Sequence, residues 1–182
     1  MNDNSFAVFT AIGPDRVGIV DDLSGLVVSH GGNIEESKMA VLGGEFAAVM
    51  LISMEPTALA DLGGAVPALQ EKLGLRLELK ATCKQESAAT GRPYILETVS
   101  LDTPGIVHAV TAIIKTYGIN IEELETATQP APWTGAPMFR MRATIILAPQ
   151  VSVAKLKADL AVLESERDLD ISLKPALPVP PE

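Results

Sequence analysis

The chain has 182 residues, of which 47% are hydrophobic and 20% charged, and its formal net charge is −9. This much apolar surface excludes intrinsic disorder. An acidic chain is a poor partner for nucleic acid or an anionic membrane, because both attract clustered cations. A single cysteine, Cys83, excludes an internal disulfide and a zinc site built from several cysteines. Neither a signal peptide nor an apolar run of the ~20 residues that span a membrane is visible. We therefore expect a soluble, cytoplasmic protein with no nucleic-acid or membrane partner.

The first elements predicted along the chain are a strand, a helix and a hairpin. Residues 6–12 are rich in β-forming side chains and end at a Gly-Pro turn. Residues 17–30 carry apolar side chains at the spacing of one helix face. Two apolar runs, 33–42 and 45–54, then flank Gly43-Gly44, which is typical of a β-hairpin.

A second helix and a fourth strand complete this first unit. Leucines and valines recur at three- and four-residue steps between 59 and 69, although Gly63, Gly64 and Pro67 should weaken or kink the helix. Apolar and charged side chains alternate over 75–81, which predicts a half-buried strand.

The second half of the chain repeats the first. Asp15 to Val20 matches Asp102 to Val107 at an offset of 87, and the same offset relates the Gly-Gly-Asn-Ile of 31–34 to the Gly-Ile-Asn-Ile of 118–121. The offset grows to 93 between Phe46 and Phe139, so the second copy has an insertion of six residues in a Pro/Gly-rich loop, 129–137, that holds Trp133.

This duplication defines the domains and the fold class that we expect. The domains are 1–82 and 93–176, joined by a polar linker, 83–92, and followed by a proline-rich tail, 177–182. The repeated order βαββαβ is the ferredoxin-like plan, in which two helices cover one face of a four-stranded antiparallel sheet. The sequence therefore predicts an α+β protein of two ferredoxin-like domains.

The two sheets are expected to differ on the face without helices. In the second copy, apolar side chains alternate with Arg140, Arg142 and Thr144, which indicates a solvated face. In the first copy, Phe46 to Ile52 is apolar on both faces. We hypothesise that a protein–protein or inter-domain contact covers this face of the first sheet.

No catalytic constellation is apparent. His30 lies in the last turn of the first predicted helix, which favours packing or a helix-end role, and His108 lies on a polar face. The pairs Glu35-Glu36 and Glu122-Glu123 are neighbours on a strand and should point to opposite faces, so they form no carboxylate dyad. No nucleotide, hydrolase or metalloprotease motif occurs. We expect a protein that is not an enzyme and needs no cofactor or metal.

Two kinds of position could bind a small molecule. The turns before the first helix of each copy place backbone N–H groups near Gly18 and Gly105, where a carboxylate could bind. Asp15, Asp102, Arg16, Asn33 and Asn120 add donors and acceptors. These residue types suit an α-amino acid. The alternative is purely structural, with Asp or Thr capping the helix, Pro104 starting it, and Asn ending a turn.

These segments resemble those of the ACT domain. Gly-Pro-Asp-Arg-x-Gly-Ile-Val at 13–20 with Gly-Gly-Asn-Ile at 31–34 is similar to one ACT domain, although Val17 stands where proline usually precedes the glycine. Asp-x-Pro-Gly-Ile-Val at 102–107 with Gly-Ile-Asn-Ile at 118–121 is similar to another. Two such domains without a catalytic module resemble the glycine cleavage system transcriptional repressor family.

The resemblance implies a regulator that binds an amino acid, with glycine and serine as candidates. ACT domains pair side by side, and they bind ligands between the strand–helix turn of one domain and the Gly-x-Asn-Ile strand of its neighbour. Repression would act through contact with a DNA-binding transcriptional activator or another protein, in a homo-oligomer; the alternative is a regulatory subunit of a metabolic enzyme. The implied ligand-binding residues are Asp15, Arg16, Gly18, Asn33, Ile34, Asp102, Gly105, Asn120 and Ile121.

Overall fold

The computed structural model describes residues 4–83 and 91–176, and it divides the chain into two compact units, Met1–Glu86 and Ser87–Glu182. The predicted tail, 177–182, and residues 84–90 of the predicted linker lie outside the described residues. Arg92, which the sequence placed in the linker, is the first residue of a strand.

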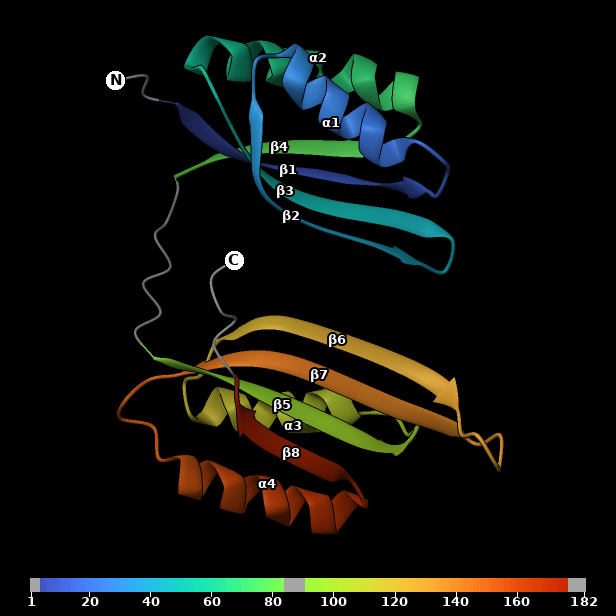
Figure 1. Ribbon diagram of the computed structural model, residues 1–182, viewed down its shortest axis with the longest axis vertical. Helices are drawn as coiled ribbons and strands as arrows, with labels where there is room; N and C mark the ends of the chain where they lie inside the picture. Colours follow the sequence, from blue (N-terminus) through green and yellow to red (C-terminus); the bar gives the residue numbers. More distant parts are fainter. Residues whose placement is uncertain (1–3, 84–90, 177–182) are drawn as a thin grey trace. The chain divides into compact units, whose positions relative to one another are not determined.

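The first unit is a four-stranded antiparallel sheet with both helices on one face (Figure 1). Its strand order is β2-β3-β1-β4, so β1 and β3 are central and β2 and β4 are edges. The elements follow the predicted order: β1 (Ser5–Pro14), α1 (Ile19–Ser29), β2 (Asn33–Leu42), β3 (Glu45–Met54), α2 (Pro56–Leu73) and β4 (Arg76–Thr82).

The second unit repeats this plan with strand order β6-β7-β5-β8 (Figure 1). The α+β, ferredoxin-like prediction is therefore confirmed. The elements are β5 (Arg92–Leu101), α3 (Ile106–Thr116), β6 (Ile121–Pro130), β7 (Pro137–Leu147), α4 (Val153–Arg167) and β8 (Asp170–Pro175). No helix among the described residues is long and apolar enough to cross a membrane.

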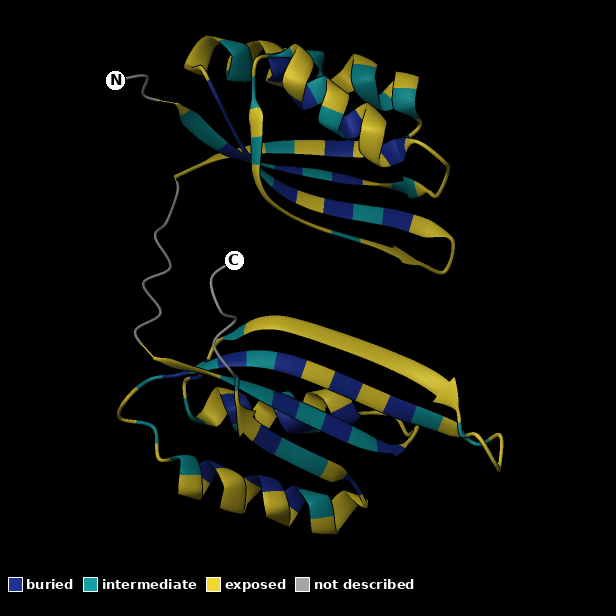
Figure 2. Ribbon diagram, viewed as in Figure 1, coloured by how far each residue is buried: buried dark blue, intermediate teal, exposed yellow. Residues whose placement is uncertain are grey.

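Each unit has its own hydrophobic core between its sheet and its helices (Figure 2). The predicted apolar faces of the helices supply it: Ile19, Leu23 and Val27 are buried on α1, as are Ile106, Val110 and Ile114 on α3. The edge strands β2 and β6 are exposed over most of their length. The sheet side of each core therefore comes mainly from the two central strands, together with Leu77 of β4 and Leu173 of β8.

Two turns differ in ways that the sequence indicated. Gly43 and Gly44 both have positive φ, 62° and 86°, as a tight two-residue hairpin requires. In the second unit the loop is longer, and it leaves Trp133 97% exposed. The two strands that flank this loop extend into the predicted loop, 129–137: β6 continues to Pro130, and β7 starts at Pro137. The helix α2 runs as one helix with Pro67 inside it.

Candidate ligand-binding site

The turn from β1 to α1 places Asp15, Arg16 and Gly18 together at one end of the first sheet. Gly18 is the N-cap of α1 and adopts φ 88°, a left-handed conformation that glycine accepts without strain. The backbone N–H of Asp15 donates to the carbonyl of Gly44 at 2.9 Å, which ties the turn to the β2–β3 hairpin. The predicted residues of this turn therefore form one local group.

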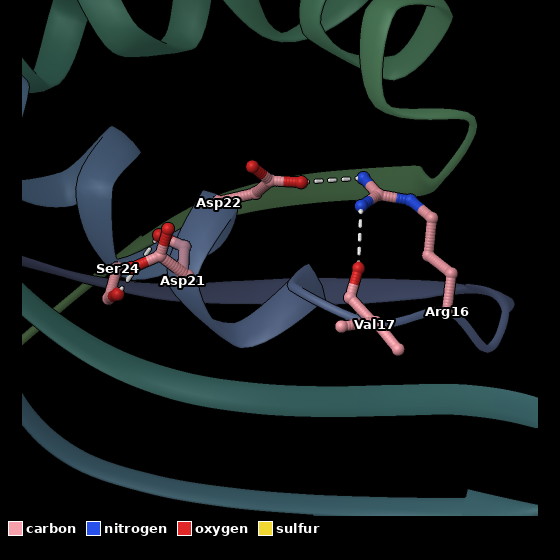
Figure 3. A network of polar contacts seen from close by, with 5 residues as sticks. All are labelled: Arg16, Val17, Asp21, Asp22 and Ser24. Atoms are coloured by element: carbon pink, nitrogen blue, oxygen red, sulfur yellow. Dashed lines mark hydrogen bonds and ion pairs between the residues drawn. The ribbon is translucent and has the colours of Figure 1, made fainter.

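The charge of Arg16 is directed back onto the helix (Figure 3). Its guanidinium pairs with the Asp22 carboxylate at 2.7 Å and lies 3.5 Å from the carbonyl of Val17. Asp21 and Asp22 both lie in the first turn of α1. These acidic groups compete with an incoming carboxylate for the helix N-terminus and for Arg16.

The helix caps differ from the structural alternative considered for the sequence. No described side chain caps α1 or α3; each helix begins after a glycine, and Pro104 precedes the N-cap Gly105 rather than starting α3. The expectation that Asp or Thr caps these helices is therefore wrong, because the turns place the flexible glycine at the cap position. The first backbone N–H groups of both helices have no side-chain acceptor there.

The turn from β5 to α3 is the counterpart in the second unit, and its charges are arranged differently. Gly105 adopts φ 91°, and the first turn of α3 carries no acidic residue. The Nη1 atom of Arg167, at the end of α4, lies 3.7 Å from the position that a Cβ would occupy on Gly105. Among the described residues, Arg167 has no ion pair or hydrogen-bond partner. A carboxylate beside Gly105 would therefore lie near the Arg167 guanidinium and away from any acidic residue of the first turn of α3, although Asp102 belongs to the same β5–α3 turn.

The surface over this second turn is shallowly hollowed. A depression of about 570 Å³ is lined by the turn, the first residues of α3 and Phe139 of β7. Asp102 lies at its rim and accepts a hydrogen bond from the Thr128 hydroxyl at 3.2 Å, while its backbone N–H donates to the carbonyl of Pro137 at 2.9 Å. The depression has room for a small amino acid.

The two asparagines have the same partners in both units. The Asn33 amide donates to Glu35 at 3.2 Å, and the Asn120 amide donates to Glu122 at 2.9 Å. A β-bulge follows each asparagine, between Ile34 and Glu36 and between Ile121 and Glu123. Both isoleucines pack against the core of their unit. The backbone conformation around each asparagine is therefore shared by the two copies.

The bulge changes the expected direction of the glutamates. Glu35 accepts hydrogen bonds from the Asn33 amide and, at 2.7 Å, from the Ser53 hydroxyl. Asn33 and Ser53 are cross-strand partners. Glu36 lines a hollow with Val8, Val49 and Leu51. Glu35 and Glu36 therefore lie on the same face, contrary to the simple alternation, because the extra residue of a bulge shifts the pleat by one.

The turn residues and the asparagine of one unit do not meet. Asn33 pairs with Ser53, which pairs with Phe6 at the start of β1, whereas Asp15 follows the end of β1. The length of the strand separates them by about 30 Å at ~3.4 Å per residue. In the second unit Ile121 pairs with Ile145 near the start of β5, and Asp102 follows its end. In each unit the two groups of candidate residues thus lie at opposite ends of the sheet.

The remaining candidates have structural surroundings. The His30 Nδ1 lies 2.9 Å from the carbonyl of Leu26 at the end of α1, as a helix-end role requires, and His108 and Cys83 are exposed. Among residues 4–83 and 91–176, no group of three or more His, Cys, Asp or Glu is placed to hold a metal ion. Arg167 is the feature that sequence reasoning missed, because nothing in the sequence connects the end of the last helix with Gly105.

The first unit is similar to a known family. Residues 5–80 match the family model described as the ACT domain. The glycine cleavage system transcriptional repressor of Escherichia coli (strain K12) is 28% identical over 166 residues, which cover 91% of this chain and 87% of the relative.

Two solved structures share the fold over nearly the whole chain. A protein of unknown function from Galdieria sulphuraria is 33% identical, covers 96% of this chain and all of its own, and superposes with a TM-score of 0.79. A structure that carries the name "putative glycine cleavage system transcriptional repressor" is 24% identical, covers 96% of this chain and 98% of its own, and superposes with a TM-score of 0.71.

Proposed function

We propose that this protein is a tandem ACT-domain, non-catalytic, amino-acid-responsive regulator of transcription. Residues 5–80 match the ACT domain model, and the second unit repeats the fold of the first. The observation that carries the proposal is the similarity, over 91% of the chain, to a glycine cleavage system transcriptional repressor.

The proposed ligand is a small amino acid, with glycine and serine as the first candidates. A helix N-terminus without a side-chain cap offers N–H donors for the ligand carboxylate, and Asp15 or Asp102 offers an acceptor for its ammonium group. Since the asparagine of the same unit lies at the other end of the sheet, a complete site needs the Asn-Ile segment of a different ACT domain. The proposed residues are Asp15, Arg16, Gly18, Asn33, Ile34, Asp102, Gly105, Asn120 and Ile121.

The second turn is proposed as the stronger of the two ligand sites. Arg16 is already paired with Asp22 at 2.7 Å, so the first turn has to break an ion pair to use it. Arg167 has no such partner among the described residues, and α3 has no acidic residue in its first turn. Both differences favour carboxylate binding beside Gly105.

The proposed output is contact with another protein. The formal net charge of −9 disfavours direct binding to DNA, because DNA binding gains most of its affinity from cations placed on phosphates. A DNA-binding transcriptional activator is therefore the proposed partner. The ligand would act by binding the partner-competent and partner-free states with different affinity.

Thermal unfolding of the full chain with each standard amino acid at millimolar concentration tests the ligand. A ligand at ~100 times its Kd adds about 2.7 kcal/mol of stability. For a chain of this size we expect a rise in Tm of about 5–10 °C with one amino acid or a small set. Asn33→Ala or Asn120→Ala should reduce the shift, whereas Lys155→Ala, an exposed change on α4, should not. A flat response to all amino acids would contradict amino-acid sensing.

Transcription tests the output. Deleting the gene should raise the transcripts of the glycine cleavage genes. In gel-shift assays the purified chain alone should leave the promoter DNA unshifted but change the shift caused by the activator. Co-purification with a catalytic chain whose kinetics it alters, and no effect on these transcripts, would instead favour a regulatory subunit of a metabolic enzyme.

A further inference from the structure

The face of the first sheet away from its helices has an apolar centre, which we call the outer face. Cross-strand pairing places Val8 beside Leu51, Thr10 beside Val49, and Ile12 beside Ala47 on this face, while their strand neighbours Phe9 and Met50 are buried in the core. Val49 is 54% exposed and Ile12 is 51% exposed. A central stripe of apolar side chains therefore faces outward on β1 and β3.

Charged side chains border the stripe on both edge strands in an ordered pattern. In one row across the sheet, Glu36 of β2 pairs with Leu51, and Lys80 of β4 pairs with Val8. In the next row, Lys38 of β2 pairs with Val49, and Glu78 of β4 pairs with Thr10. From β2 to β4, the first row therefore begins with a negative side chain and ends with a positive one. The next row has the opposite order.

The same face of the second sheet is different. Its centre carries Arg140 and Arg142, both exposed, and Arg142 pairs with Glu97 at 3.0 Å. These charged side chains suit a face in contact with solvent. The apolar centre of the first sheet is therefore a property of its sequence rather than of the ACT fold, which both units share.

We propose that the outer face is an interface with a second copy of this chain, with the two first sheets packed face to face. A twofold axis parallel to the strands places β2 of one copy over β4 of the other. Glu36 then faces Lys80 of the partner and Lys38 faces Glu78 of the partner, while Leu51 faces Val8. In these two rows the rim is self-complementary, as a twofold interface between identical surfaces requires. In the third row, that of Ala47 and Ile12, Arg76 of β4 faces Ala40 of the partner.

Charge pattern and size favour a second copy over a different partner. An unrelated partner of an acidic chain would carry an excess of positive charge, whereas this rim carries both signs, in an order that matches a second copy of itself in two rows. Four strands ~4.8 Å apart and about seven residues long give roughly 450 Å² per copy, or about 900 Å² in total. This is near the lower limit for specific interfaces, so the dimer should form in the micromolar range.

Charge reversal in the full chain tests the interface by sedimentation analysis from 1 to 100 µM protein. We expect a monomer–dimer equilibrium. Glu36→Lys and Lys80→Glu should each raise its dissociation constant at least tenfold, because either change places like charges opposite each other at both 36–80 contacts of the dimer. A mixture of the two variants should regain the dimer. Val49→Asp, at the exposed centre, should abolish it with an unchanged circular dichroism spectrum.

Matched changes in the second unit provide the control. Glu123→Lys and Lys174→Glu occupy the corresponding positions of the second sheet and should leave the dimerisation constant unchanged. If the dimer is instead regained by mixing Glu36→Lys with Lys38→Glu, the interface is the same outer face, but its twofold axis runs across the strands. A chain that stays monomeric, or a dimer insensitive to all these variants, would overturn the proposal. The amino-acid-induced shift in Tm is a separate measurement, so failure here leaves the proposed function standing.

Discussion

Thr98→Val should stabilise the second unit. The Thr98 side chain lies on the core side of β5, between Met141 of β7 and Ile171 of β8, and it is completely buried. Its hydroxyl has no hydrogen-bond partner among the described residues. The corresponding residue of the first unit is Ala11, which brings no polar group into its core.

The expected gain follows from two contributions. A buried hydroxyl without a partner costs about 1–3 kcal/mol, and the methyl group that replaces it adds about 0.8 kcal/mol of apolar burial. Imperfect fit of the new methyl group offsets part of this gain, so we expect a net increase of about 1–2 kcal/mol in the free energy of unfolding. For a unit of this size that corresponds to a rise in Tm of roughly 5–10 °C.

Calorimetry of the full chain measures the transition, and hydrogen exchange of peptides from β5 assigns the gain to the second unit. Thr98→Ser is the matched control: it keeps the hydroxyl, loses the methyl group and should destabilise the unit by about 1 kcal/mol. If Thr98→Val is neutral or destabilising while Thr98→Ser has little effect, the hydroxyl has a partner, such as a buried water, and the reasoning is refuted.

Three further predictions concern the ligand site, the helix start and alkaline stability. Arg167→Ala should weaken amino-acid binding about tenfold or more, since charge-assisted hydrogen bonds contribute about 1.5–3 kcal/mol; titration calorimetry measures it, and an unchanged Kd would exclude Arg167 from the site. Gly105→Ala should lower the free energy of unfolding, measured by chemical denaturation, by about 1–2 kcal/mol, because the φ of Gly105 is 91°. Gly25→Ala, inside α1 with open space around it, should raise it by about 0.5–1 kcal/mol. Equal effects of the two changes would contradict the conformational argument. The Tyr117 hydroxyl donates to Asp159 at 2.5 Å, and this hydrogen bond, with desolvation and the carboxylate charge, raises the pKa of Tyr117 from 10.0 to about 12. Because the folded state holds this proton more tightly, its stabilising effect is complete below pH 10 and is lost as the pH rises towards 12. Phenolate absorbance, compared between the wild type and Tyr117→Phe, follows the titration; a midpoint near 10 would contradict it.

Much of the fold could be predicted because it depends on local patterns that occur twice. The spacing of Ile19, Leu23 and Val27 defined the buried face of α1, and the Gly43-Gly44 pair defined a hairpin, since both signals lie within a few residues. The repeat at an offset of 87 then extended each assignment to the second unit. The ends of the strands were less accurate, because β6 and β7 pair with each other through prolines that sequence patterns assign to loops.

The candidate site was harder to predict because it depends on relations across the fold. The sequence grouped Asp15 with Asn33 by chemistry, but the strand between them places them at opposite ends of the sheet. The bulge after Ile34 places Glu35 and Glu36 on one face of the sheet. The alternation of residues along a strand does not predict a bulge, so the sequence predicted opposite faces. The approach of Arg167 to Gly105 depends on where α4 ends above the sheet, which only the packed structure gives.

The placement of the two groups of candidate residues at opposite ends of one domain has a consequence for stoichiometry. If the proposed ligand site is formed by two such domains lying antiparallel, each turn meets the Asn-Ile segment of the other domain, and one pair would hold two ligands. Both ligands would then bridge the same two domains, and the doubly liganded pair would grow with the square of ligand concentration below saturation. Such a pair would respond to its amino acid over a narrower range of concentration than a single pocket, without any change in the shape of either domain.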